Sequence, residues 1–143
     1  MVEWLKSGLS RIADGTLLPA AYYGQLDCDA ALDSRDGAEF DAEWVRQSKE
    51  VNGRWAAATV AADARALAED IRRESFLAVS RATRQHEIAS YVSDDFDLIV
   101  RGRLVGAEGR FLDQLWGVYE RGEFPFPPLP AGEPAEPGDG DGP

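Results

Sequence analysis

The stretch from Arg54 to Ala82 contains neither glycine nor proline, and this feature most narrows the folds open to the chain. The stretch is rich in Ala, Leu, Arg and Glu, which are all favourable in helices. Apolar and small side chains recur along it at helical spacing: Val60, Ala64, Leu67, Ala68, Ile71, Ser75, Ala78 and Val79. This periodicity predicts a long amphipathic helix.

Similar spacing on both sides predicts four further helices, over about residues 2–13, 38–51, 84–104 and 108–121. Asn52-Gly53 has the character of a helix stop, and Ser93-Asp94 could begin a new helix inside the fourth segment. No β-hairpin pattern accompanies them. We therefore predict an all-α fold, a compact bundle of about five helices.

Residues 16–37 are the least regular part of the predicted domain. The segment Ala20 to Leu26, with its paired tyrosines, fits a short strand or an irregular crossing. The residues from Asp27 to Gly37 are dense in turn formers. A short β element near residues 20–26 is therefore the main alternative to an entirely helical chain.

The composition changes after residue 123. The segment Phe124-Pro-Phe-Pro-Pro-Leu-Pro has polyproline character, and no apolar side chain larger than Ala follows from Ala131 onward. We therefore predict a single helical domain over residues 1–123 and a Pro/Gly/acid-rich tail over residues 124–143 that is largely disordered.

Charge is the strongest indication of what the chain binds. The formal net charge is −11, and the segment from Asp27 to Glu43 carries seven acids against one base, Arg35. Nucleic-acid binding is driven by basic side chains that neutralise phosphates, so this balance argues against a nucleic-acid partner. It is compatible with a basic protein partner.

Cysteine and arginine usage indicate the cellular setting. Cys28 is the only cysteine, so an internal disulfide is excluded, and neither a signal peptide nor a membrane span is evident. Thirteen of the fifteen basic residues are arginine, which is typical of proteins from GC-rich bacterial genomes. We expect a cytoplasmic bacterial protein.

One histidine and three acids are candidate ligands for a metal site: His86, Glu87, Asp94 and Asp97. On an unbroken helix, residues seven or eleven positions apart share a face, and an imidazole with carboxylates can bind a divalent metal. No second histidine completes a zinc-protease motif, however. The favoured interpretation is structural, with Asp94 or Asp95 capping a helix and Asp97 pairing with Arg101.

No phosphate-binding loop, dinucleotide fingerprint or nucleophile-elbow motif is present, so we expect no cofactor and favour a protein that is not an enzyme. The favoured function is that of a bacterial interaction protein, of an antagonist or immunity type, with an acidic partner-binding surface. Its residues would be Asp27, Asp29, Asp33, Asp36, Glu39, Asp41 and Glu43. The alternative is a metal-binding protein or hydrolase centred on His86, Glu87, Asp94 and Asp97. The oligomeric state is left open.

Overall fold

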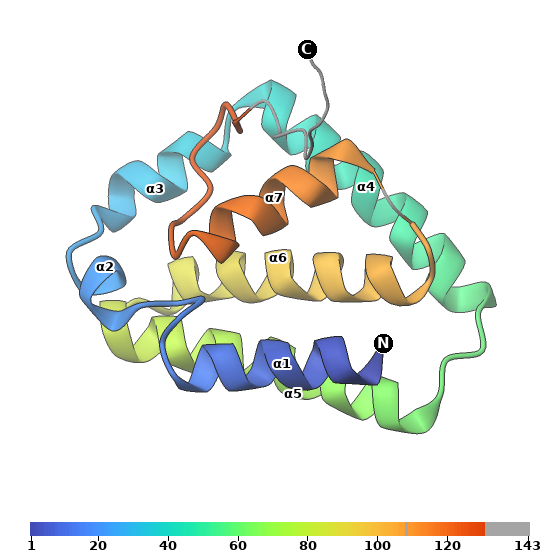
Figure 1. The fold of residues 1–143 in the computed structure, drawn as a ribbon. Coiled ribbons are helices and arrows are strands. Elements are labelled where there is room, and N and C mark those ends of the chain that lie inside the picture. The colour runs from blue at the N-terminus through green and yellow to red at the C-terminus, as the bar shows by residue number, and fades with distance from the viewer. Residues whose placement is uncertain (108, 131–143) are drawn as a thin grey trace, which may run out of the picture.

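Every regular element in the part of the chain that the structure describes, residues 1–107 and 109–130 of a computed structural model, is an α-helix (Figure 1). These described residues form seven helices: α1 (Val2–Ala13), α2 (Ala20–Gly24), α3 (Cys28–Arg35), α4 (Ala38–Ala57), α5 (Ala62–Thr83), α6 (His86–Leu104) and α7 (Arg110–Glu120). The predicted all-α class is confirmed, and the count exceeds the predicted five because residues 16–37 contain two short helices.

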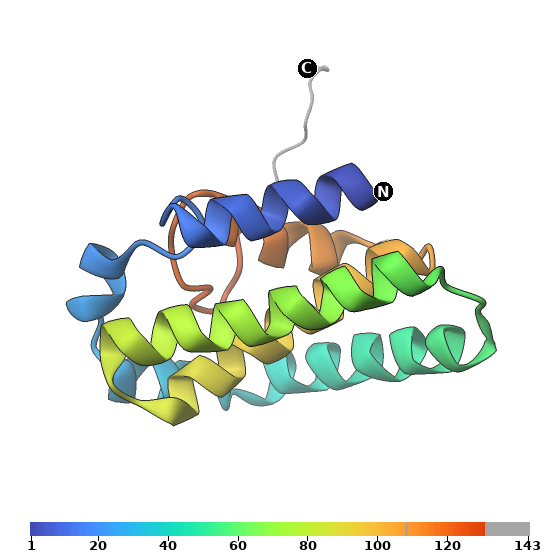
Figure 2. The ribbon, with the colours of Figure 1, turned by 90° about the horizontal axis from the view of Figure 1, so that it is seen from below.

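Helix α6 runs through the middle of the molecule (Figure 1). On one side it packs along α5, against which α1 also packs, and on the opposite side it contacts α3, α4 and α7 (Figure 2). Because it has neighbours on both sides, α6 buries ten residues, including the charged Asp95. A helix that serves as the centre of a bundle must be apolar over most of its circumference.

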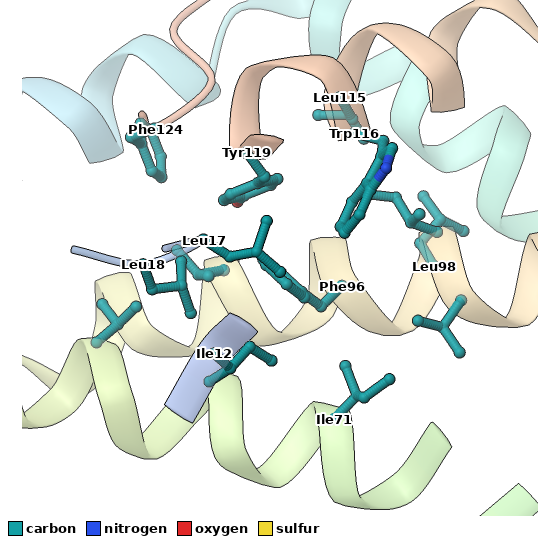
Figure 3. Packing of buried hydrophobic residues seen from close by; sticks show 14 of the residues in the cluster. Ile12, Leu17, Leu18, Ile71, Phe96, Leu98, Leu115, Trp116, Tyr119 and Phe124 are labelled. Carbon is teal, nitrogen blue, oxygen red and sulfur yellow. The ribbon is translucent and has the colours of Figure 1, made fainter. Parts of the chain in front are cut away.

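Aromatic side chains fill the space between α6, α7 and α1 (Figure 3). The ring of Trp116 lies 5.3 Å from that of Trp4 and 6.0 Å from that of Phe96, measured between centroids. Phe96 in turn meets the ring of Tyr119 edge-on at 4.7 Å. Tilted and edge-on contacts of this kind stabilise a core beyond the burial of their area.

The short β element considered near residues 20–26 is absent, because Ala20–Gly24 form helix α2. Pro19 at φ −65° is suited to the start of a helix, and its carbonyl accepts a hydrogen bond from the Tyr23 N–H. The single turn places the Tyr23 side chain in the core and lets the Tyr22 hydroxyl accept a hydrogen bond from the Phe124 N–H. A strand would need a partner strand, and the described residues provide none.

The turn-forming residues that follow instead make helix α3. Asp27 is its N-cap, and its Oδ1 accepts a hydrogen bond from the Ala30 N–H at 3.1 Å. Asp29 adds a negative charge in the first turn, where the helix dipole favours it. The acids that suggested turns are therefore a helix start.

Two predicted boundaries between α4 and α5 are also wrong. Helix α4 continues through Asn52-Gly53 to Ala57, and the predicted long helix is interrupted by extended backbone near Ala58. Gly53 is exposed, so it lowers the stability of α4 by only about 1 kcal/mol relative to alanine. Beyond it, Trp55 lies beneath the Arg65 and Arg101 guanidinium groups, at 5.0 and 5.6 Å, and these contacts hold the end of α4 against its neighbours.

Helix α6 is continuous, so the break considered at Ser93-Asp94 is absent. Neither Asp94 nor Asp95 is a helix cap, because both lie in the middle of α6. The predicted pair between Asp97 and Arg101 is confirmed, with 3.0 Å between Oδ2 and Nε.

The segment after α7 lies against the helices as far as the structure describes it. Phe124 is buried, Leu129 packs on the core, and Gln114 donates a hydrogen bond to the Pro130 carbonyl at 2.7 Å. The rest of the predicted tail, residues 131–143, lies outside the described residues, so the division at residue 123 stays a prediction. Among the described helices, none combines the length and apolar character needed to cross a membrane.

Candidate functional site

A buried ion pair joins α3 to α6. The Arg35 guanidinium donates two parallel hydrogen bonds to the Asp95 carboxylate, from Nη1 to Oδ2 at 3.0 Å and from Nη2 to Oδ1 at 2.8 Å. The Arg35 side chain is 4% exposed and that of Asp95 is 0% exposed. A bidentate pair is the geometry in which buried opposite charges compensate each other best.

Two more helices donate to the same carboxylate. The Trp44 indole of α4 donates to Asp95 Oδ1 at 2.9 Å, and the Tyr119 hydroxyl of α7 donates to Oδ2 at 2.6 Å. Burial, followed by the negative charge of Asp95, raises the pKa of Tyr119 well above its usual value, so the phenol keeps its proton. Asp95 is thereby bonded to α3, α4 and α7 at once.

Aromatic rings cover the Arg35 guanidinium. Its central carbon lies 4.4 Å from the centroid of Phe40, 5.3 Å from that of Phe124 and 5.8 Å from that of Tyr91. Burial opposes the charge of Arg35, but the Asp95 carboxylate outweighs it and holds the arginine pKa above its ordinary value. Arg35 is therefore a permanently charged group inside the protein, and Asp95 neutralises it.

A cavity of about 170 Å³ opens beside this pair, at the junction of α3, α4 and α6. The ion pair and three aromatic side chains form its interior, and three exposed acids stand around it. The lining residues are Arg35, Asp36, Phe40, Asp41, Trp44, Tyr91, Asp94 and Asp95.

The seven acids predicted to bind a partner lie on α3, on the α3–α4 turn and on the first two turns of α4, and together we call them the acidic surface. All are exposed except Glu43, which is half-buried and pairs with Arg46. Asp36 and Asp41 line the cavity, whereas Glu39 and Glu43 line a neighbouring open groove. Asp29 and Asp33 lie on the exposed side of α3, where Asp27 caps its start.

The four residues of the metal interpretation are not brought together. Within residues 1–107 and 109–130, no three His, Cys, Asp or Glu side chains form a group that could hold a metal ion. His86 Nδ1 lies 2.9 Å from the Ser80 hydroxyl, and its ring stacks on Phe76. Asp97 pairs with Arg101, and Asp94 lies at the cavity. Glu87 is exposed in the first turn of α6. This arrangement gives the metal interpretation no geometric support.

Asp94 is nevertheless an unusual acid. Desolvation, and then the charges of Asp95 and Asp97, raise its pKa above the ordinary value, and Arg72 offsets this only in part. The structure thus places one member of the predicted metal set beside Asp36 and Asp41 of the acidic surface.

Sequence reasoning missed the residues that organise the site, namely Arg35, Asp95, Trp44 and Tyr119. One signal was present for Asp95, which stands seven residues after Ile88 and next to Phe96, in phase with the buried face of α6. An acid on such a face needs a buried basic partner. The partner Arg35 lies sixty residues away, beyond what local spacing can indicate.

These features define a class: a small all-helical domain in which a buried charge network joins four of the helices. Residues 9–126, most of the chain, match the family described as Immunity protein PIM1, so the chain belongs to this family. A comparison with curated proteins found no match. Membership of an immunity-protein family confirms the immunity type that the sequence favoured.

Proposed function

We propose that the protein neutralises a toxin by binding it through the acidic surface. The family is described as one of immunity proteins, and we infer that this chain protects by binding the toxin directly. The partner is expected to present a basic face, and the proposal requires no cofactor. We place this action in the bacterial cytoplasm, a compartment that suits a protein whose single cysteine can form no internal disulfide.

The observation that carries this proposal is the burial of Arg35. It is the only base between Asp27 and Glu43, and the Asp95 carboxylate neutralises its charge in the interior of the protein. The acidic surface is therefore left without a neutralising base from its own segment. Arg46, from the next turn of α4, compensates Glu43 alone among the seven.

Uncompensated charge of one sign acts mainly on the rate at which partners meet. A basic partner would be steered toward the acidic surface at low salt, and the effect would fade as salt shortens the screening length to about 8 Å at physiological ionic strength. Association should therefore be fast and strongly salt-dependent.

The test begins with the immobilised protein, which captures its partner from the source cell. The captured protein is then produced alone and together with the immunity protein in a host cell. The proposal predicts growth arrest in the first case and rescue in the second. A captured protein that leaves growth unaffected would contradict the toxin assignment.

The surface itself is tested with the purified partner and the triple variant Asp33→Lys, Asp36→Lys and Asp41→Lys. Stopped-flow measurement should show slow association of the variant, with little dependence on salt, and fast, salt-dependent association of the wild type. Equal association rates at every salt concentration would exclude the acidic surface as the interface.

A matched control carries the same change of net charge on the other side of α6. The variant Glu3→Lys, Glu69→Lys and Asp70→Lys reverses three acids of α1 and α5. It should associate at close to the wild-type rate, whereas an equal slowing by both variants would indicate a general effect of net charge. Circular dichroism of both variants checks that the helices remain folded.

A further inference from the structure

Three acids from separate elements meet at the cavity beside the buried ion pair. Asp36 is the C-cap of α3, Asp41 lies in the first turn of α4, and Asp94 lies in the middle of α6. The one base among the lining residues, Arg35, is already neutralised by Asp95. The hollow therefore holds a net negative charge that no basic lining side chain balances.

The cavity also has aromatic walls suited to a flat cation. Phe40, Trp44 and Tyr91 line it, and the faces of Phe40 and Tyr91 already lie over the Arg35 guanidinium. Aromatic faces attract cations, and arginine more often than lysine. Acids around the opening and rings along the wall together fit a guanidinium group better than they fit a compact ammonium or a metal ion.

The size of the cavity agrees with this chemistry. Its volume of about 170 Å³ corresponds to roughly five or six water molecules at ~30 Å³ each, which a guanidinium and its last methylenes could replace. In the free protein the ionised form of Asp94 is disfavoured, because desolvation and the nearby carboxylates of Asp95 and Asp97 oppose its charge. A cation placed beside Asp94 would relieve this repulsion.

We propose that the cavity receives one arginine side chain of the bound partner, with the guanidinium against the rings of Tyr91 and Trp44 and its charge balanced by Asp36, Asp41 and Asp94 at the opening. This inference rests on the proposed function and adds to it the central contact of the interface. The acidic surface would then speed the encounter, and the cavity would set the lifetime of the complex.

The cavity can be tested without the partner by titrating the protein with N-acetyl-L-arginine amide and recording amide and indole NMR shifts. Saturable shifts are expected at the Trp44 indole and around Tyr91 and Asp94. N-acetyl-L-citrulline amide, which is neutral and of the same shape, should produce none. Equal shifts with both probes, or shifts spread over the outer side of α3, would overturn the proposal. A lysine derivative that binds more tightly than the arginine derivative would overturn the guanidinium assignment.

Asp94→Asn and Asp33→Asn form a matched pair for the same titration. Each removes one exposed acid, but only Asp94 lines the cavity. Asp94→Asn should abolish most of the response to the arginine probe, and Asp33→Asn should leave it close to that of the wild type. An equal loss in both variants would mean that the probe senses only the general negative field, which contradicts a site.

The purified partner separates failure of the cavity from failure of the acidic surface. Asp94 lies outside the segment 27–43, so Asp94→Asn does not alter the acidic surface. We expect it to weaken binding by about tenfold, mainly through faster dissociation, as truncation at a central contact typically does. Wild-type affinity of Asp94→Asn together with impaired association of the triple lysine variant would overturn the cavity and leave the proposed function standing. Wild-type behaviour of both would overturn both.

Discussion

The floor and the rim of the cavity are formed by residues that are adjacent in sequence but differ in burial. Arg35 and Asp95 form the buried floor. Asp36, which follows Arg35, and Asp94, which precedes Asp95, are exposed at the rim. A helix turns by a large angle with each residue, so two consecutive acids of α6 face the core and the solvent respectively. The comparison teaches that burial against a matched counter-ion turns a charge into a structural element, whereas exposure leaves the charge available to another molecule.

The largest effect is expected at the floor. Asp95→Asn leaves the buried Arg35 charge without a counter-ion, and breaking a buried pair in this way typically costs about 3–5 kcal/mol. Urea unfolding followed by circular dichroism measures the loss. A change as small as that of a surface substitution would remove the distinction between floor and rim.

A second variant tests whether the ion pair itself stabilises the fold, or whether only an unpaired buried charge is unfavourable. Replacing both partners, with Arg35→Met and Asp95→Leu, removes the charges without leaving either one alone. We expect stability well above that of Asp95→Asn, because buried pairs can often be replaced by apolar residues at little cost. If the double variant is less stable than the single one, the ion pair itself is the main source of stability here.

An intermediate loss of stability is expected when a neutral hydrogen-bond donor to the Asp95 carboxylate is removed. Tyr119→Phe removes the hydroxyl that donates to Asp95 Oδ2 and keeps the ring in the core. A hydrogen bond to a charged group contributes about 1.5–3 kcal/mol, so the free energy of unfolding should fall by that amount. Loss of the indole donor in Trp44→Phe should act in the same direction. Thermal denaturation of both variants provides the measurement, and unchanged midpoints would mean that Arg35 alone satisfies the carboxylate.

At the rim, loss of a charge should increase the stability of the fold rather than decrease it. The pKa of Asp94 is raised above 3.8, so the folded state binds the proton more tightly than the unfolded chain and loses stability as the pH rises through the folded pKa. Asp94→Asn removes the ionised group and should raise the melting temperature slightly at pH 7. The difference should vanish below the unfolded pKa of 3.8, where both states of the wild type are protonated. A destabilised Asp94→Asn at pH 7 would show that this acid is structural.

The smallest effect is expected on the outer side of α3. Asp33 is exposed, and no hydrogen bond or ion pair of its side chain occurs within the described residues. Asp33→Asn should therefore change the free energy of unfolding by no more than about 0.5 kcal/mol, as is usual at such surface positions. A larger loss would indicate that the acidic surface also supports the fold.

Periodicity was sufficient to predict the five long helices, although not where α4 ends and α5 begins, and it was insufficient for the short helices. Helices α1, α6 and α7 follow the apolar spacing of residues such as Leu5, Ile88 and Leu115, which are fully buried. Helices α2 and α3 span only 5 and 8 residues, too few for a repeating pattern, and depend on the Asp27 cap and on the burial of Tyr23. Their turn-forming composition supports a helix start as readily as a loop.

Charge composition predicted only the acidic segment from Asp27 to Glu43 as a partner-binding surface, which stays a prediction, and the buried network beside it was not predicted. The acid-rich segment indicated where uncompensated charge would gather, since charge counts need no fold. That Arg35 would be withdrawn into the core, and that Asp94 would join Asp36 and Asp41, depends on how α3 and α4 pack against α6. Such pairings between distant segments are set by tertiary contacts, which single-sequence spacing does not contain.

The long sequence separation of the buried pair has a consequence for the order in which the protein folds. Helices α5 and α6 are consecutive and joined by two residues, so their contacts can form early at little entropic cost, whereas Arg35 and Asp95 must close a gap of sixty residues. We expect the α5–α6 hairpin to take part in the folding nucleus and the floor of the cavity to close late. The proposed partner-binding surface is then expected to be among the last parts to form, so a nascent or partly unfolded chain should bind the proposed partner only after folding is complete.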